Sequence, residues 1–105
     1  MIGQITPREL QARLAAADPP MVLDVREGWE LAIARLAGTR DIPMNDVPAH
    51  LSELPRDREI VVMCRSGGRS LKVAEYLDRM GFRATNLTGG ILAWSRDVDP
   101  SLATY

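Results

Sequence analysis

The stretch that most constrains the fold of this chain is residues 60–70, IVVMCRSGGRS, an apolar run that ends at the only cysteine and continues as a glycine-rich turn. Four apolar residues without polar alternation predict a strand buried on both faces, as in a parallel sheet covered by helices. The pattern after the turn predicts a helix over 71–80, with Gly81 to end it and with a buried face made of Val73, Ala74, Leu77 and Met80. Cys64 therefore lies between the carboxyl end of a strand and the amino end of a helix.

This position should make Cys64 a nucleophile. The free N–H groups of a first helical turn and of a glycine-rich loop converge on one small volume and favour negative charge there. Arg65 and Arg69 add positive charge nearby, so we expect the pKa of the Cys64 thiol to be lowered. Gly67 and Gly68 allow the backbone to curl over the sulfur. A buried structural cysteine, the other role for a lone thiol, fits these charged and glycine-rich neighbours poorly.

The rest of the chain alternates predicted strands with predicted helices. The sequence predicts strands over 1–5, 21–25, 39–42 and 83–87, and helices from the Thr6 cap to before Pro19, over 28–36, over 45–54 and from Ile91. This order predicts a single α/β domain over 1–105 with right-handed crossovers. The carboxyl ends of parallel strands meet at one edge of a sheet, so Asp24 and Arg26 should lie near Cys64.

Composition and charge exclude several classes of function. A formal net charge of −1 over 105 residues gives no electrostatic support for a nucleic-acid partner. A single cysteine excludes an internal disulfide and a multi-cysteine metal site, and we expect neither a metal nor a cofactor. No apolar run is long enough to span a bilayer and no signal-peptide pattern is present, so we expect no membrane partner. A cytoplasmic location is then the default, and it suits a cysteine that must stay reduced.

Taken together, four motifs resemble those of the rhodanese-like sulfurtransferases. They are Leu23-Asp24-Val25-Arg26-Glu27 with Trp29-Glu30, Ile42-Pro43, the cysteine loop over 64–70, and the stretch over 87–94. The resemblance implies a five-stranded parallel sheet with helices on both faces. It also implies that Cys64 takes the outer sulfur of thiosulfate or a similar donor as a persulfide and passes it to cyanide or a thiol. The implied substrate cradle consists of Arg65, Ser66, Gly67, Gly68, Arg69 and Ser70.

One departure from the family pattern affects how the cysteine is activated. Arg35 stands where the family often has a histidine, and the only histidine, His50, is expected to be an ordinary solvated residue of a surface helix. No Cys-His pair is then available, so activation must come from the N–H groups and arginines of the loop. The ending over 94–105 is similar to that of rhodanese domains fused behind enzymes that adenylate sulfur-carrier proteins, which makes a sulfur-carrier protein a candidate acceptor.

Two functions from other classes compete with sulfur transfer. Cysteine-dependent phosphatases and arsenate reductases have five residues between the cysteine and the arginine of their anion loop, whereas four separate Cys64 from Arg69. The shorter loop suits one sulfur atom better than a tetrahedral group with three outer oxygens. A non-catalytic binding module is the third candidate, and the retained cysteine argues against it.

Several other residues have two candidate roles. Arg26 can hold the sulfonate of thiosulfate at the rim of the cleft or serve the structure, and both roles are open. For Asp24 we favour a structural role in holding the loop. Arg69 should support the bound anion and the loop, while Arg65 should project toward the entrance. Trp29 and Trp94 have helical spacing with apolar neighbours, so both are expected in the core.

Overall fold

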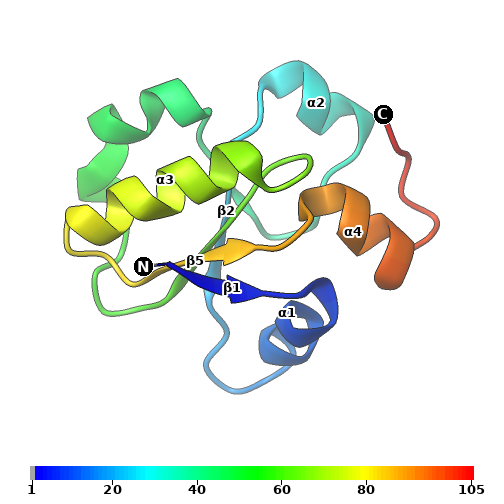
Figure 1. Ribbon diagram of the computed structural model, residues 1–105, viewed down its shortest axis with the longest axis horizontal. Coiled ribbons are helices and arrows are strands. Elements are labelled where there is room, and N and C mark those ends of the chain that lie inside the picture. Colours follow the sequence, from blue (N-terminus) through cyan, green and yellow to red (C-terminus); the bar gives the residue numbers. More distant parts are fainter. Residues whose placement is uncertain (1) are drawn as a thin grey trace.

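In the computed structural model, which describes residues 2–105, five parallel strands form one sheet in the order β1-β5-β4-β2-β3 (Figure 1). The strands are β1 (Gly3–Ile5), β2 (Met21–Asp24), β3 (Arg40–Asp41), β4 (Ile60–Met63) and β5 (Ala84–Leu87). The helices are α1 (Pro7–Leu14), α2 (Gly28–Ile33), the 3₁₀ helix η1 (Met44–Glu53), α3 (Gly68–Arg79) and α4 (Gly90–Asp97). The predicted α/β fold with a five-stranded parallel sheet is confirmed, and the cysteine follows its central strand.

Side chains of β4 alternate between two hydrophobic clusters, one on each face of the sheet. Ile60 and Val62 belong to the cluster that α3 and η1 cover, and Val61 and Met63 belong to the cluster that α1 and α4 cover. All four side chains are fully buried. The run has no polar residue because neither face of this strand meets water. The prediction of helices on both faces is therefore also confirmed.

Element boundaries differ from the predicted ones where side chains compete for the backbone. The capping box of Thr6 and Glu9 starts α1 as expected. Helix α2 ends at Ile33 rather than at residue 36, because Ala34 is extended and its carbonyl oxygen accepts a hydrogen bond from buried Arg26. The predicted helix over 45–54 is the 3₁₀ helix η1. The predicted strand over 1–5 is observed from Gly3, and residue 1 lies outside the described part.

Burial agrees with helical periodicity for some residues and not for others. Trp94 is 8% exposed and lies in the core, as predicted. Trp29 is 63% exposed, so its expected place in the core was wrong, because short α2 turns Glu30 inward and leaves Trp29 on its outer side. Met80 is also exposed rather than buried, since it caps the end of α3 just before Gly81. Helical periodicity predicts which side chains share one face of a helix, but not which face of the helix packs against the sheet.

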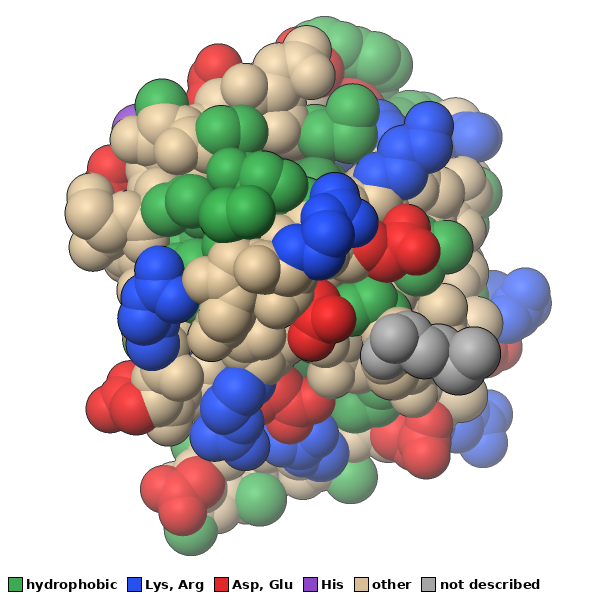
Figure 2. Space-filling view, turned by 60° about the vertical axis from the view of Figure 1, so that its left-hand side comes forward, with side chains coloured by type: hydrophobic (Ala, Val, Ile, Leu, Met, Phe, Trp, Pro, Cys, Tyr) green, Lys and Arg blue, Asp and Glu red, His purple; other side chains and the backbone are tan. Residues whose placement is uncertain are grey.

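The cluster under α3 and η1 reaches the surface between these two helices. Figure 2, which brings the left-hand side of Figure 1 forward, shows hydrophobic side chains gathered in a patch among charged ones. Met44 and Tyr76 are partly buried hydrophobic residues that pack on this cluster, and they line a cavity of about 170 Å³.

Within residues 2–105, every helix is too short or too polar to cross a membrane.

Candidate active site

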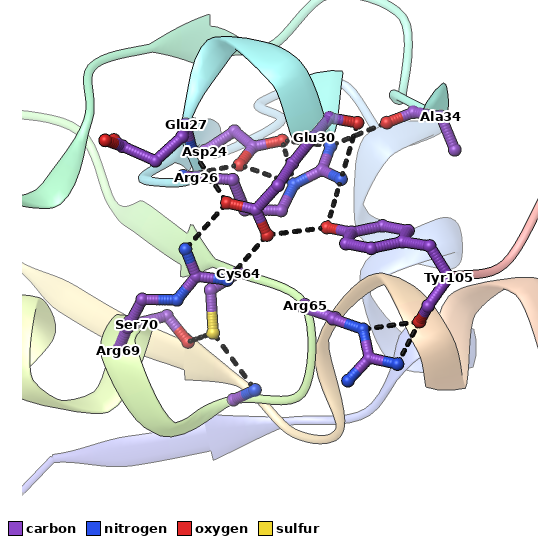
Figure 3. Close-up of polar contacts among 11 residues, drawn as sticks. Asp24, Arg26, Glu27, Glu30, Ala34, Cys64, Arg65, Arg69, Ser70 and Tyr105 are labelled. Carbon is purple, nitrogen blue, oxygen red and sulfur yellow. Dashed lines mark hydrogen bonds and ion pairs between the residues drawn. The ribbon is translucent and has the colours of Figure 1, made fainter. Parts of the chain in front are cut away.

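The Cys64 sulfur lies in a cup made by its own loop and the first turn of α3. Cys64 directly follows β4 and is only 1% exposed. The Gly67 N–H donates to Sγ at 3.1 Å and the Ser70 hydroxyl donates at 3.3 Å (Figure 3). Because α3 begins at Gly68, three residues earlier than predicted, the amino end of the helix lies directly at the sulfur. The predicted position of Cys64 between strand and helix is confirmed.

Hydrogen bonds to the sulfur lower the pKa of the Cys64 thiol. Burial, the largest influence, raises this pKa, because it disfavours the charged thiolate. The Ser70 hydroxyl and the backbone N–H groups of Ser70, Gly67 and Ser66 act in the opposite direction and together outweigh burial. The direction agrees with the sequence-based expectation, but its cause is mainly the hydrogen-bond donors of the loop rather than the two arginines. A lowered pKa increases the fraction of thiolate, which is the nucleophilic form of cysteine.

Replacing Ser70 with alanine should raise the pKa of Cys64, because it removes the side-chain donor and leaves the backbone N–H groups in place. We expect the pH midpoint of iodoacetamide alkylation to move upward and alkylation near neutral pH to become slower. Because the chain has a single cysteine, all alkylation of a thiol reports on Cys64. Ser66→Ala is the matched control, because Ser66 contributes its backbone N–H and should keep the parental midpoint. An unchanged midpoint in Ser70→Ala would exclude this role for the hydroxyl.

Helix α4 holds the other side of the loop. The Ile91 N–H donates to the Cys64 carbonyl oxygen at 2.9 Å, and the Leu92 N–H donates to the Arg65 carbonyl oxygen at 3.1 Å. Gly90, at the start of this helix, has φ +60°, and a Cβ there would lie 2.4 Å from the Arg65 carbonyl oxygen. Only glycine allows so close an approach. With its carbonyl groups bound to α4, the loop turns its N–H groups toward the sulfur.

Arg69 holds the loop to α2 through Glu30. Its two terminal nitrogens donate to the two carboxylate oxygens of Glu30, both at 2.8 Å (Figure 3). The Arg69 hydrogen bond, against the opposing effect of burial, lowers the pKa of Glu30 to about 2. The pKa of Arg69 is raised, chiefly by Glu30 and to a smaller extent by the Cys64 thiolate. Arg69 therefore supports the loop as expected, and Glu30 is the partner that the sequence analysis did not identify.

Replacing Glu30 with glutamine should destabilise the protein near neutral pH by about 2 kcal/mol, the scale for charged hydrogen bonds when one partner is partly solvated. The Arg69 side chain is 35% exposed, which limits the loss. The folded-state pKa of Glu30 lies below its ordinary 4.5, so the stabilisation is present above that pH and is lost as pH falls toward about 2. Denaturant unfolding at several pH values should therefore show the difference between parent and variant shrinking below pH 4.5.

The matched control for this experiment is Glu75→Gln, which removes an exposed carboxylate from α3 and should leave stability nearly unchanged. A Glu30→Gln protein that is as stable as the control near neutral pH would show that the ion pair with Arg69 does not hold the loop.

Asp24 and Arg26 form a buried pair behind α2. The Arg26 guanidinium donates to both oxygens of Asp24, with Nη2 to Oδ2 at 2.8 Å, and also to the carbonyl oxygen of Ala34. Both side chains of the pair are fully buried. Arg26 does not lie at the rim of the cleft, so the structure corrects that candidate role and favours the structural one. Asp24 is paired with an arginine, as a structural role requires, but its hydrogen bonds go to Arg26 and not to the cysteine loop.

Arg65 is turned toward the segment after α4 and not toward the entrance. Its Nε donates to the backbone carbonyl oxygen of Tyr105 at 2.5 Å, and its Nη2 donates to the same oxygen. The expected projection of Arg65 toward the entrance is therefore wrong. Ser66 and Gly68 are exposed at the mouth of the loop. Of the predicted cradle, the structure thus brings Gly67, Ser70 and the Ser66 N–H to the sulfur and gives Arg65 and Arg69 partners elsewhere.

Asn86, Tyr105 and Gly90 also belong to the site, although the sequence analysis did not identify them. The Ser70 hydroxyl lies 2.6 Å from the Asn86 side-chain oxygen, a second acceptor that competes with the sulfur for its single hydrogen. The Asn86 amide donates to the Gly67 carbonyl oxygen and so ties β5 to the loop. For Gly90 the sequence signal was the Gly89-Gly90 pair within the motif over 87–94. The places of Asn86 and Tyr105 in the site depend on tertiary contacts.

The other cavities and side-chain clusters of the described residues lack a cysteine nucleophile or a set of metal ligands. A cavity of about 780 Å³ opens at the amino end of β2, with Pro19, Arg40 and Arg58 in its lining, and no residue of the cysteine loop lines it. His50 pairs with Glu53 in η1, away from the sulfur, as expected for a solvated residue. Within residues 2–105, no group of three His, Cys, Asp or Glu side chains is placed to hold a metal ion. The cysteine loop is therefore the candidate active site.

Comparisons with known proteins agree with this fold. Residues 6–97 match the family model described as "Rhodanese-like domain". A sulfurtransferase of Allochromatium vinosum is 38% identical over 104 residues, which cover 98% of this chain and 97% of that protein. The crystal structure of a rhodanese-like domain protein from Staphylococcus aureus superposes with a TM-score of 0.87 at 33% identity, over 99% of each chain.

A longer relative joins this domain to a second activity. The probable adenylyltransferase/sulfurtransferase MoeZ of Mycobacterium tuberculosis is 35% identical over 104 residues, which cover 96% of this chain but only 26% of that protein. The match of nearly the whole chain to the family model, together with close similarity to sulfurtransferases of full length, leads to one conclusion: this chain belongs to the rhodanese-like family of sulfurtransferases.

Proposed function

We propose that this protein transfers sulfane sulfur from thiosulfate, or from a persulfide donor, to a thiophilic acceptor through a persulfide on Cys64. The observation that carries the proposal is the Cys64 sulfur, whose pKa is lowered by converging donors from Ser70, Gly67 and Ser66. The same donors can stabilise the negative outer sulfur of a persulfide, because they are fixed before the reaction begins.

The two chemical steps are displacements at sulfur. The Cys64 thiolate attacks the outer sulfur of thiosulfate, the new S–S bond forms, and the old S–S bond breaks with its electron pair leaving on sulfite. An acceptor such as cyanide or a thiolate then attacks the outer sulfur and releases the Cys64 thiolate, so cyanide becomes thiocyanate. Sulfite and the thiolate both leave as stable anions, so neither step needs a general acid, which fits a site without a histidine near the sulfur.

The acceptor of this sulfur can be a sulfur-carrier protein as well as a small molecule. Its longer relative is named as an adenylyltransferase and sulfurtransferase, which supports a sulfur-carrier protein as acceptor alongside cyanide or a small thiol. We propose a cytoplasmic location, because a single unpaired cysteine stays reduced there.

The contacts of Arg69 support sulfur transfer over the phosphatase alternative. The edge of its guanidinium that carries both terminal nitrogens is bound to Glu30, so only the Nε side is left for an anion in the loop. Turnover of a chromogenic aryl phosphate by the parent protein, lost in Cys64→Ser, would restore the phosphatase alternative.

Mass spectrometry of the intact protein tests the persulfide directly. Treatment with thiosulfate should add one sulfur atom, an increment of about 32 Da, to the parent chain, and cyanide should remove it. Cys64→Ser should gain no mass under the same conditions. A parent protein that gains no sulfur from thiosulfate or from a small-molecule persulfide would overturn the proposed function and favour a non-catalytic binding module.

A further inference from the structure

The segment after α4, residues 98–105, runs from the end of that helix to the neighbourhood of α2 (Figure 1). It is anchored near its middle, where the Ser95 hydroxyl donates to the Leu102 carbonyl oxygen at 3.1 Å and Leu102 packs on the cluster under α1 and α4. Ala103 and Thr104 are exposed, and within the described part of the chain neither makes a hydrogen bond. The position of the three residues after Leu102 therefore depends on Tyr105.

Tyr105 is held by two buried charged groups of the site. Its hydroxyl donates to Glu30 Oε1 at 2.8 Å and accepts a hydrogen bond from Arg26 Nη1 at 2.8 Å (Figure 3). Its ring meets the exposed ring of Trp29 edge to face, with centroids 5.9 Å apart. The hydroxyl thus bridges two ion pairs, Arg69–Glu30 at the cysteine loop and Arg26–Asp24 behind α2.

Arg65, the residue after the nucleophile, is bound by the same tyrosine. Its guanidinium donates twice to the Tyr105 carbonyl oxygen, and its central carbon lies 5.1 Å from the centre of the Tyr105 ring. Figure 3 shows this guanidinium turned toward Tyr105, on the side away from the Cys64 sulfur. Since Glu30 binds both terminal nitrogens of Arg69, each arginine of the loop has two of its nitrogens hydrogen-bonded within the protein.

We propose that Tyr105 is a specificity-determining residue, which limits the attraction of the Cys64 site for anionic reagents by holding Arg65 away from the sulfur. While Tyr105 is docked, the loop offers incoming anions its backbone N–H groups, and the Arg65 guanidinium stays turned away from the sulfur. When Tyr105 leaves, Arg65 can turn toward the sulfur and favour donors in proportion to their negative charge. The discrimination among sulfur donors rests on the proposed function. The discrimination between charged and neutral reagents that alkylate the Cys64 thiolate does not.

Alkylation of Cys64 tests the proposal without any sulfur transfer. Iodoacetate is an anion and iodoacetamide is neutral, and the ratio of their rate constants cancels any change in the pKa of the thiol. In Tyr105→Ala this ratio should rise about threefold at low ionic strength, as expected when a guanidinium comes within roughly 6 Å of one negative charge in a water-like medium. The rise should disappear in about 1 M salt.

Two further variants assign the effect. Adding Arg65→Ala to Tyr105→Ala should return the ratio to the parental value or below it, because the freed guanidinium is then absent. Tyr105→Phe keeps the ring but loses both hydroxyl hydrogen bonds, so its ratio should rise less than that of Tyr105→Ala, and it serves as the test if Tyr105→Ala does not fold. If Tyr105 had only a structural role, its replacement would change the rates with iodoacetate and with iodoacetamide by the same factor, and the ratio would stay parental. A ratio that stays parental in the folded Tyr105 variants, or a rise that survives Arg65→Ala, would overturn the proposal.

Sulfur transfer provides the second arm of the experiment. Thiosulfate carries two negative charges, so kcat/KM for thiosulfate should rise by about tenfold in Tyr105→Ala, roughly the square of the effect for one charge. If the parent protein forms no thiocyanate while the alkylation ratio changes as stated, the proposed function fails and the role of Tyr105 stands. If the parent forms thiocyanate and the ratio does not change, the role of Tyr105 fails and the proposed function stands.

Discussion

Replacing Cys64 with serine should abolish sulfur transfer from thiosulfate to cyanide, with a loss of about 10³-fold or more in the rate of thiocyanate formation. A serine hydroxyl is not ionised near neutral pH, and its oxygen lacks the polarisable nucleophilicity of a thiolate. The loop donors that lower the pKa of Cys64 cannot compensate for this, because they stabilise an anion that serine does not form.

The fold should survive the Cys64→Ser substitution, which makes the result interpretable. Serine is close to cysteine in size, and the Gly67 N–H and the Ser70 hydroxyl next to the sulfur can both donate to a serine oxygen. Circular dichroism and thermal unfolding should therefore resemble those of the parent. A folded Cys64→Ser protein that kept more than a few per cent of the parental rate would mean that another residue carries the sulfur.

The sequence was sufficient to predict the fold and the position of the candidate nucleophile, Cys64. The unbroken apolar run before Cys64 predicts a strand buried on both faces, and a chain that alternates such strands with helices has few ways to pack. The position of the cysteine followed from the same pattern, because a glycine-rich turn between strand and helix places a side chain at the amino end of that helix. These conclusions need only contacts between neighbours along the chain.

The partners of the arginines could not be predicted in the same way. Arg65 and Arg69 lie close to Cys64 in sequence, Arg26 follows the strand next to it in the sheet, and each was a plausible anion-binding group. In the structure each one is bound within the protein: to Asp24, to the Tyr105 backbone and to Glu30, in that order. The last two contacts join residues 40 and 39 positions apart in the chain, and local pattern does not encode such contacts.

This difference changes how charge acts in the candidate site. The sequence suggested that the N–H groups of the loop and two free arginines together activate the cysteine, whereas in the structure the N–H and hydroxyl groups at the amino end of α3 are what lowers the pKa of Cys64 against burial. Neutral donors of this kind stabilise the thiolate without attracting every anion in solution. Under the proposed function, the access of an anionic sulfur donor can then be controlled separately from the reactivity of Cys64.

Replacing Gly90 with alanine should disrupt the cup around the sulfur, although Gly90 is 26 positions away from Cys64 in the sequence. A Cβ at this position would lie 2.4 Å from the Arg65 carbonyl oxygen and 2.5 Å from the Cys64 carbonyl oxygen, far inside contact distance. Backbone atoms cannot rotate away as a side chain can, so the loop must move away from α4. We expect a loss of about 2–4 kcal/mol in stability from the clash and the left-handed backbone together.

The loss in rate should exceed what the loss in stability alone explains. When the loop moves, the Ile91 and Leu92 N–H groups lose the carbonyl oxygens of Cys64 and Arg65, and the donors on the other side of the loop no longer point at the sulfur. Removing one fixed donor from a developing negative charge costs about 10²-fold in other enzymes, and we expect a loss of that size in thiocyanate formation by the fraction that remains folded.

Gly38→Ala separates the clash from the strain of the backbone. Gly38 has φ +78°, and a Cβ built there meets no atom within 4 Å, whereas Gly90 has a similar φ of +60° and meets the loop. Both variants should lose about 1 kcal/mol or more to the left-handed conformation, but only Gly90→Ala should lose sulfur transfer and show a higher pKa for Cys64 in alkylation. Equal rates in the two variants would show that α4 does not hold the loop, and the fixed orientation of the N–H groups would then need another cause.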